Sequence, residues 1–289
     1  AAVERIGEHA GGALAVAWQG GGALFASSGQ DGEVRLWDSR TREARVIHAT
    51  AEWSERLAFS TNGKLLAVAN ARRLHVFDAG GAEIAMLPDH PGSIAALAWR
   101  PKVNEIAALG NGGLRLHRLG TPAVTRDYPW KGACLTASWR PDGSVLASGL
   151  QDGTVHFWNI AAGTQSEMKG YGAKVMHTAW TANGKYLATA ADQSIVVWEF
   201  AGRGPEGSEP LQLDGHTGRI VQIATPAKGP YLASAARDGR LLLWRPGFAD
   251  APVDADLLAD EPALLRFSPD GRMLLAVTRD GAAVAYRCG

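Results

Sequence analysis

The sequence has little cysteine, no excess of charge of either sign and no long apolar run. Cys134 and Cys288 are the two cysteines, too few for a disulfide framework, and we interpret both as free thiols, which suits the reducing cytoplasm. Lysine plus arginine and aspartate plus glutamate both number 29, so general nucleic-acid binding, which needs excess positive charge, is disfavoured. No run approaches the roughly 18 apolar residues of a membrane span, so we expect no membrane partner.

Motifs of common catalytic and metal sites are also missing. The sequence has no Gly-x-Ser-x-Gly elbow and no phosphate-binding loop. It has no Cys-x-x-Cys or His-x-x-x-His pair, although His75 and His156 take equivalent places in the repeat described next. We therefore expect a protein that is not an enzyme, with no metal and no cofactor.

What the sequence does have is an internal repeat of about 41 residues. Seven β-like runs end in a bulky, usually aromatic residue at intervals of 40 to 46 residues: Trp37, Phe77, His117, Trp158, Trp198, Trp244 and Tyr286. Because no segment breaks the period, we expect residues 1–289 to form a single domain. Asp-Gly turns such as 152–153 and 238–239 separate short strands, and each repeat has room for four of them. Four strands per repeat without a helical stretch indicate one propeller blade.

In these features the chain resembles the WD40-repeat β-propellers. The family's Trp-Asp and Gly-His signatures occur in full at Trp37-Asp38 and Gly215-His216. Near matches stand at Phe77-Asp78, Trp158-Asn159 and Trp198-Glu199. The resemblance covers essentially the whole chain and implies an all-β fold, a seven-bladed β-propeller with four-stranded antiparallel blades.

The resemblance also implies a buried hydrogen-bond network of His, Ser or Thr, Asp and Trp in each blade. Two blades carry full sets, namely His9, Ser27, Asp31 and Trp37, and His216, Ser234, Asp238 and Trp244. The fourth blade has Trp130 near the histidine position, and the fifth has Tyr171 there. The second and third blades lack the turn aspartate, so we expect packing, not this network, to hold them.

Eight of the ten tryptophans occupy repeated positions, and we interpret them as core: Trp18, Trp37, Trp99, Trp139, Trp158, Trp180, Trp198 and Trp244. Trp53 and Trp130 fall in connections that lead into an inner strand, on the face that this family often uses for binding. Exposed tryptophans are good interface anchors, and Trp53 is the stronger candidate. Trp130 either serves the interface or fills the missing histidine site of the fourth blade.

The same face is expected to present the residues before the turn aspartates and those entering the inner strands. Besides Trp53 and Glu261 these are Gln30, Gln151, Lys174, Arg219, Arg237 and Arg279. The three arginines come from neighbouring repeats and form either a basic patch for an acidic or C-terminal peptide, or a patch neutralised by nearby acids. Those acids are Asp254, Asp256, Asp260 and Glu261. Residues 201–210, rich in Gly, Pro and Glu, are an insertion on the opposite face, either mobile surface or a partner tether.

By analogy with the family, we expect a non-catalytic scaffold that presents one propeller face to proteins or peptides, as a monomeric propeller within a complex. Two alternatives are a small-ligand or metal-handling protein that uses the central channel, and an enzyme with an atypical site. A channel lined by convergent Asp, Glu or His would favour these, and a broad aromatic and arginine-rich face would favour the scaffold.

The two ends of the sequence predict how the ring of blades closes. The seventh repeat has only three residues after Tyr286, and residues 2–6 precede the first repeat, so we expect this segment to supply the last blade's outer strand. Deleting residues 1–7 should then markedly lower the melting temperature measured by circular dichroism. An unchanged melting temperature would refute this closure.

Overall fold

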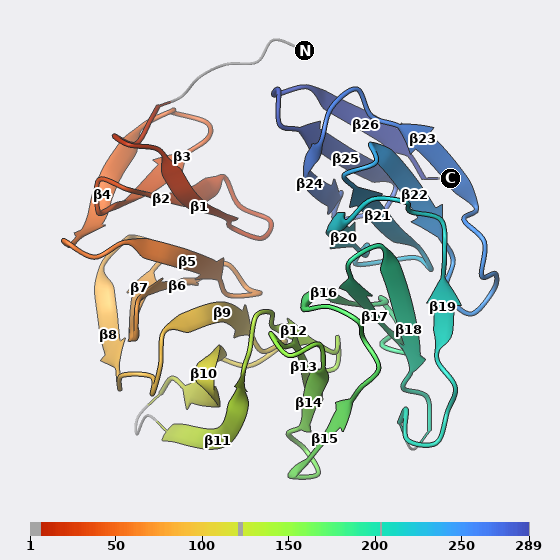
Figure 1. Ribbon diagram of the computed structural model, residues 1–289. Coiled ribbons are helices and arrows are strands. Elements are labelled where there is room, and N and C mark those ends of the chain that lie inside the picture. Colours follow the sequence, from red (N-terminus) through yellow and green to blue (C-terminus); the bar gives the residue numbers. More distant parts are fainter. Residues whose placement is uncertain (1–6, 121–123, 203, 289) are drawn as a thin grey trace. The chain divides into compact units, whose positions relative to one another are not determined.

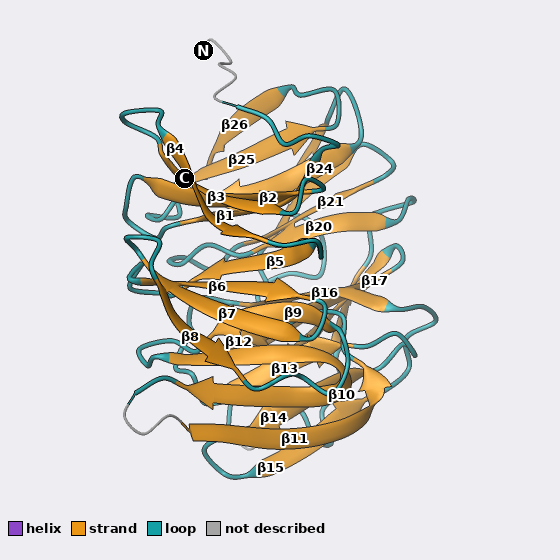
Figure 2. Cartoon of the chain, turned by 90° about the vertical axis from the view of Figure 1, so that its left-hand side faces the viewer, coloured by secondary structure: helices purple, strands orange, loops and turns teal. Residues whose placement is uncertain are grey.

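The chain consists of strands, turns and loops wherever its structure is described (Figure 2). The computed structural model describes residues 7–120, 124–202 and 204–288. No helix in these ranges is long and apolar enough to cross a membrane. The chain divides into two compact units, Ala1–Ala137 and Ser138–Gly289, so the single domain expected from the period stays a prediction.

Three antiparallel sheets form the first unit (Figure 1). The first sheet contains β1 (Ala13–Trp18), β2 (Leu24–Gly29), β3 (Glu33–Asp38) and β4 (Ala44–Ala49), and the second contains β5 (Ser54–Phe59), β6 (Leu65–Asn70), β7 (Arg73–Asp78) and β8 (Glu83–Leu87). The third contains β9 (Ile94–Trp99), β10 (Glu105–Arg118) and β11 (Val124–Ala133). The first strands β1, β5 and β9 contact one another in sequence order.

The third sheet differs from the expected four strands because β10 continues through the position of a turn. Its first half pairs with β9 and its second half with β11. The Leu119 N–H donates to the Asn104 carbonyl at 2.9 Å, so the two halves fold back on each other like the second and third strands of the other sheets. Gly112 and Gly113, with φ of 101° and 102°, provide the reversal, because this backbone region favours glycine.

Four antiparallel sheets form the second unit (Figure 1). The strands of the first two are β12 (Ser138–Trp139), β13 (Val145–Gly149), β14 (Val155–Asn159) and β15 (Thr164–Met168), then β16 (Val175–Trp180), β17 (Tyr186–Ala191), β18 (Ser194–Glu199) and β19 (Leu211–Leu213). Those of the last two are β20 (Ile220–Ala224), β21 (Leu232–Ala236), β22 (Arg240–Trp244) and β23 (Asp254–Leu257), then β24 (Pro262–Phe267), β25 (Met273–Thr278) and β26 (Ala283–Arg287).

Within the described residues the chain thus has seven sheets, each antiparallel, in agreement with the predicted repeat. The last sheet contains three strands in this part of the chain. Residues 2–6, which we expect to complete it, lie outside the described residues. The ring closure therefore stays a prediction.

The core lies between consecutive sheets of each unit, where alternate side chains of one sheet pack on those of the next. Leu36 of β3 and Val68 of β6 share one such layer, and Val155 of β14 and Leu187 of β17 share another. Burying a side chain of this size stabilises the fold by roughly 1.5–3 kcal/mol. The second and third sheets, which lack the turn aspartate, contain some of the largest fully buried side chains, among them Phe77 and Ile106. Packing holds these two sheets where the polar network is incomplete.

The polar network of the first sheet is fully connected. The Trp37 Nε1–H donates to Ser27 Oγ at 2.7 Å, and Ser27 Oγ lies 2.7 Å from His9 Nε2. His9 Nδ1 donates to the Asp31 carboxylate at 2.9 Å, which places the proton on Nδ1 because an ionised carboxylate only accepts. Although burial alone raises the pKa of Asp31, the hydrogen bonds from His9 and the turn hold it below its ordinary value.

The sixth sheet has the same four residues but a looser final contact. The Trp244 Nε1–H donates to Ser234 Oγ at 2.8 Å, and that oxygen lies 2.7 Å from His216 Nε2. His216 Nδ1 stands 3.4 Å from Asp238, whose carboxylate accepts the Thr217 N–H at 2.8 Å instead. The aspartate here mainly fixes the turn backbone.

In the fifth sheet Tyr171 takes the place of the histidine. The Trp198 Nε1–H donates to the Tyr171 hydroxyl at 2.7 Å, and that hydroxyl donates to Thr189 Oγ1 at 2.5 Å. Burial raises the pKa of Tyr171 to about 12, so the phenol stays protonated and can donate. The phenol thus reproduces the imidazole's bridge without the aspartate.

The fourth sheet retains Ser148 and Trp158, yet the two side chains do not bond. The Ser148 hydroxyl donates to the Gly149 carbonyl at 3.2 Å, and the buried Trp158 indole N–H has no hydrogen-bond partner in the described chain. The Trp158 ring instead packs edge-on against His156, with ring centroids 4.4 Å apart. Packing thus replaces the polar network in this sheet.

One of the eight tryptophans interpreted as core is not buried. Trp18 is 57% exposed at the end of β1, so that interpretation was wrong. Its ring stacks on Phe25, which stacks in turn on Trp37, with centroid separations of 5.0 and 5.8 Å. The stack crosses β1, β2 and β3 and buries Trp37, while Trp18 ends it at the surface. Trp198 is half-buried, and the other six are buried.

Removing the network serine should cost more unfolding free energy in a sheet where this serine bonds to His and Trp than in a sheet where it does not. Ser234→Ala leaves the buried His216 and Trp244 nitrogens without their shared partner, which should cost about 2–4 kcal/mol of unfolding free energy. Ser148→Ala, at an equally buried serine, should cost about 1 kcal/mol or less, because it removes one weak bond to a carbonyl. Urea unfolding of both variants measures the difference, and equal losses would contradict the network's role.

Six buried or half-buried histidines predict a loss of stability on mild acidification. Burial lowers the pKa of all six: His48, His90, His117, His156, His177 and His216. In the unfolded chain these histidines take up protons near the ordinary histidine pKa of 6.5, whereas in the folded chain they stay neutral to lower pH. The free energy of unfolding therefore falls as the pH drops below about 6.5. His117, with a pKa of about 4, should by itself lose roughly 2 kcal/mol between pH 7 and pH 5.

Melting temperatures recorded across this pH range measure the effect. The window lies above the carboxylate pKa values, so carboxylates contribute little to it. His117→Asn should flatten the pH dependence, whatever its effect at pH 7. A slope equal to that of the unmodified chain would contradict the assignment.

Candidate functional site

The residues predicted to bind a partner lie in turns and connections at corresponding ends of the sheets. Gln30, Gln151, Arg237 and Arg279 stand in the turns between second and third strands, and Trp53, Lys174 and Arg219 stand immediately before β5, β16 and β20. All seven are exposed. Gln30 and Trp53 belong to the first unit and the other five to the second, so each group is described by itself.

Trp130 differs from its predicted place. It lies within β11, opposite Gly112, and not in a connection between strands. Its side chain is half-buried. The placement in a connection was therefore wrong, because the outer strand of the third sheet extends further than the repeat suggested. Whether it contacts a partner stays a prediction.

The structure does bring three predicted arginines together, and we name Arg219, Arg237, Arg279 and Glu261 the arginine cluster. The backbone N–H of Arg237 donates to the backbone carbonyl of Arg219, and the backbone N–H of Arg279 donates to the backbone carbonyl of Glu261, both at 2.9 Å. Each bond fastens a turn to the segment that enters the first strand of the same sheet. The backbone therefore places these four residues at one end of two neighbouring sheets, β20–β23 and β24–β26.

Glu261 joins the two halves of the arginine cluster through its side chain. Arg237 Nε donates to Glu261 Oε1 at 3.1 Å, and Arg279 Nε lies 3.6 Å from Oε2. The guanidinium side chains are 53% and 64% exposed, whereas Glu261 is 25% exposed. One carboxylate thus orients two arginines that keep most of their donors toward solvent.

Of the four acidic residues expected to neutralise the patch, Glu261 contacts its arginines, and the hydrogen bonds of the other three within the described residues go elsewhere. The Asp260 carboxylate accepts the Asp280 N–H at 3.1 Å and is directed into that turn. Asp254 and Asp256 lie on β23, where each accepts a backbone N–H one residue on. Whether the charges of these three residues neutralise the patch stays a prediction.

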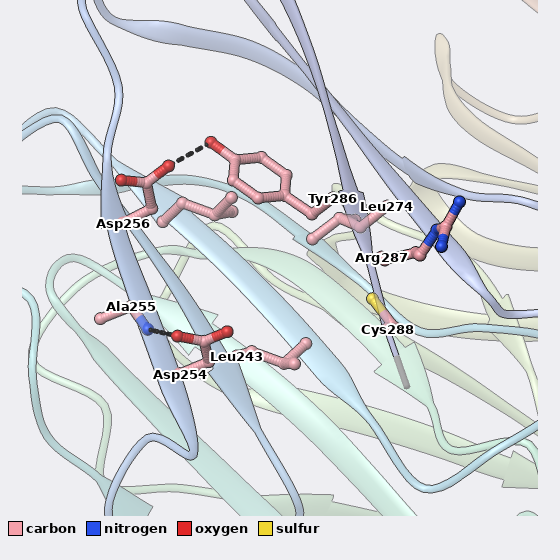
Figure 3. A pocket seen from close by; sticks show the side chains of 9 residues that line it. Leu243, Asp254, Ala255, Asp256, Leu274, Tyr286, Arg287 and Cys288 are labelled. Atoms are coloured by element: carbon pink, nitrogen blue, oxygen red, sulfur yellow. Dashed lines mark hydrogen bonds between the residues drawn. The ribbon is translucent and has the colours of Figure 1, made fainter.

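Asp254 and Asp256 instead border a small pocket between β23 and β26 (Figure 3). The Tyr286 hydroxyl donates to Asp256 at 2.7 Å, which holds the pKa of Asp256 low, while burial and Asp256 raise that of Tyr286. Cys288 lines the same pocket as a free thiol whose pKa burial raises, so it is a poor nucleophile at neutral pH. The rest of the lining consists of Leu241, Leu243, Ala255, Leu274 and Arg287.

The insertion between β18 and β19 is partly packed on its neighbour. Pro205 is buried, and Ser166 of β15 bonds to Glu206 at 3.2 Å. This part of residues 201–210 therefore lies against the β12–β15 sheet. Most of the other described residues of the insertion are exposed, and both alternatives, a mobile surface and a partner tether, stay predictions.

A group of metal-ligand type occurs in the first unit and was missed by the sequence reasoning. His48 of β4, His75 of β7 and Glu83 of β8 bring their ligand atoms within 4.8 Å of one another, and we name them the histidine cluster. Only His75 attracted notice, through its place in the repeat. The three residues span 36 positions with no fixed spacing, so the pairing of strands was the missing information.

The family comparison finds WD40 repeats, described as WD domain, G-beta repeat, over residues 3–38, 128–159, 164–199 and 207–245. Curated relatives include Protein FIZZY-RELATED 3 of Arabidopsis thaliana, 24% identical over 240 residues, which are 79% of this chain and 49% of that protein. They also include Arabidopsis Cell division cycle 20.4, cofactor of APC complex, 25% identical over 83% of this chain and 57% of that protein. The chain spans about half the length of these relatives.

Solved structures show the same fold. A chain of the mitotic checkpoint complex matches with a TM-score of 0.73 and 17% identity, over 94% of this chain and 86% of that one. The computationally designed protein Ika8 matches with a TM-score of 0.81 and 19% identity, over 96% and 84%. The repeats, the antiparallel sheets and these matches agree, and the chain belongs to the WD40-repeat β-propeller family.

Proposed function

We propose that this chain is a non-catalytic scaffold whose arginine cluster binds an acidic segment, or the C-terminal carboxylate, of a partner protein. The observation that carries the proposal is the shared carboxylate of Glu261, which holds Arg237 and Arg279 side by side and largely exposed. A guanidinium group binds a carboxylate through two parallel hydrogen bonds. Two guanidinium groups fixed at neighbouring turns therefore suit a partner with two adjacent negative charges.

Arg219 adds a third exposed guanidinium to the arginine cluster. The nearby Asp280 carboxylate accepts from the Thr278 hydroxyl and the Ala282 N–H, so its hydrogen bonds go to its own turn. What favours an anionic partner is the arrangement of the exposed guanidinium donors and not an excess of positive charge, because the carboxylates of Asp238, Asp260 and Asp280 lie in the same turns and connections.

The relatives support a role in a protein complex. One is named as a cofactor of the APC complex, and a structural neighbour is a chain of the mitotic checkpoint complex. We propose that this chain likewise acts by holding a protein in place, as one propeller within a complex. Trp53, exposed to 49% before β5, is a second candidate anchor on the first unit, independent of the arginine cluster.

A charge-reversal pair tests the arginine cluster. Arg237→Glu with Arg279→Glu should weaken binding of a fluorescent glutamate-rich octapeptide about tenfold or more, measured by anisotropy, because both carboxylate contacts are lost. The matched control reverses two exposed cations in the turns at the opposite end of these sheets, Lys228→Glu with Arg272→Glu. The control should bind the peptide like the unmodified chain. If both pairs weaken binding equally, the loss comes from the change in net charge and not from the arginine cluster.

Capture of proteins from native extract extends the same comparison to the natural partner. Proteins retained by the unmodified chain and the control, but lost by the Arg237→Glu, Arg279→Glu pair, are those held by the arginine cluster. Trp53→Ala is run in parallel and should release any partner anchored on the first unit. If every variant retains the same proteins, neither the arginine cluster nor Trp53 binds the natural partner.

A further inference from the structure

The histidine cluster joins two neighbouring sheets of the first unit through their outer strands. His48 lies on β4, the last strand of the first sheet, and His75 and Glu83 lie on β7 and β8 of the second (Figure 1). The imidazole centroids of His48 and His75 are 4.6 Å apart, and the His48 ring also packs on Phe77. The cluster thus sits where the two sheets meet, with side chains contributed from both.

The three side chains combine buried nitrogens with an accessible carboxylate. His48 Nε2 is buried and has no hydrogen-bond partner in the described chain, an arrangement that normally costs free energy. The His75 side chain is 10% exposed, and its Nδ1 lies 2.8 Å from Glu83 Oε1. The Glu83 side chain is 42% exposed, so one side of the cluster is open to water.

Two irregularities in strand pairing aim these side chains. The β3–β4 register shifts between Val34, which pairs with His48, and Arg35. The β7–β8 register shifts between Val76 and Phe77, which pairs with Glu83. Among the corresponding pairs of the other sheets, β10–β11 also shifts, between Asn111 and Gly112, whereas β14–β15, β18–β19 and β22–β23 run without a shift in the part of the chain described. A bulge turns the residues beside it, and bulges are frequent next to functional sites.

We propose that His48, His75 and Glu83 bind a divalent transition-metal ion, with zinc as the intended occupant. Two imidazole nitrogens and one carboxylate oxygen are a donor set that zinc takes in open, four-coordinate sites, with water as the fourth ligand. Ligand atoms around tetrahedral zinc are roughly 3.3 Å apart, given bonds of about 2.0–2.1 Å. The present separations bracket that value, from 2.8 Å for His75 and Glu83 to at most 4.8 Å in the group.

Binding requires small movements that the surroundings allow. The Glu83 side chain, partly in solvent, can withdraw from His75 to make room for the ion. The ion would then take up the buried lone pair of His48 that has no protein partner. Its effect would be a cross-link between β4 and the β7–β8 pair, so metal binding would stabilise the first unit.

Equilibrium dialysis and cobalt spectroscopy test the proposal on the whole chain. Protein stripped with a chelator is dialysed against zinc chloride, then loaded with cobalt(II), whose visible absorption reports on coordination by nitrogen and oxygen ligands. The test variants are His48→Gln and Glu83→Gln. The controls are His156→Gln, on β14 at the position that corresponds to His75 of β7, and Glu43→Gln, an exposed carboxylate on the β3–β4 turn.

The unmodified chain and both controls should bind about one zinc ion, and zinc should raise their melting temperature. Each test variant should bind zinc roughly 100-fold more weakly and lose the cobalt absorption, because two ligands remain. Melting of the metal-free variants separates this loss from misfolding. No stoichiometric zinc on the unmodified chain, or test variants that bind it equally, would overturn the proposal.

Discussion

The packing of each sheet on the next is the interaction on which the rest of the structure depends. A four-stranded sheet of about 40 residues cannot bury its own apolar face, so each repeat is stable only against its neighbours. Side chains such as Leu36, Val68 and Leu187 fill these layers completely. Apolar packing is sparser in the turns and connections at the sheet ends. Charged and polar side chains lie in these segments and on the outer strands.

This division explains why the buried polar network varies so widely among the sheets. In the first sheet the Ser27 hydroxyl bonds to both Trp37 and His9. In the fifth sheet the Tyr171 hydroxyl takes the place of the histidine and bonds to the tryptophan. In the fourth sheet the Trp158 indole N–H has no hydrogen-bond partner within the described chain. A missing hydrogen bond costs a kilocalorie or a few, whereas the apolar layers contribute several times as much. The network therefore adjusts the stability of individual repeats without deciding whether they form.

The period of the aromatic residues and the turn chemistry were sufficient to predict the all-β fold, because both are local properties of the chain. The proximity of the three arginines could also be predicted, since Arg237 and Arg279 take equivalent turn positions in adjacent repeats and Arg219 enters the first strand of the repeat that contains Arg237. The pairing of two arginines with Glu261 could not be resolved among four acidic candidates, because it depends on side-chain direction. The repeat does not encode how well the end of β1 is covered, so it could not predict that Trp18 is exposed. Nor does it encode the length of β11, so it could not predict that Trp130 lies within this strand.

The histidine cluster was beyond sequence reasoning for a related reason. Its side chains come from three strands, and two of them stand beside bulges that shift the pairing by one residue. Such shifts occur in some outer strand pairs, β10–β11 included, and not in others, so no single register taken from the repeat places these side chains correctly.

Glu261 gives the arginine cluster a further property. An anion that approaches Arg237 and Arg279 meets a carboxylate already in place, tethered to the same sheet as Arg279 and therefore always present at high local concentration. A ligand with a single negative charge gains little by exchanging with it, whereas one that engages both guanidinium groups at once gains enough to displace it. In the binding site proposed above, Glu261 is therefore an internal competitor of the ligand, and we expect it to select for anions that contact both guanidinium groups.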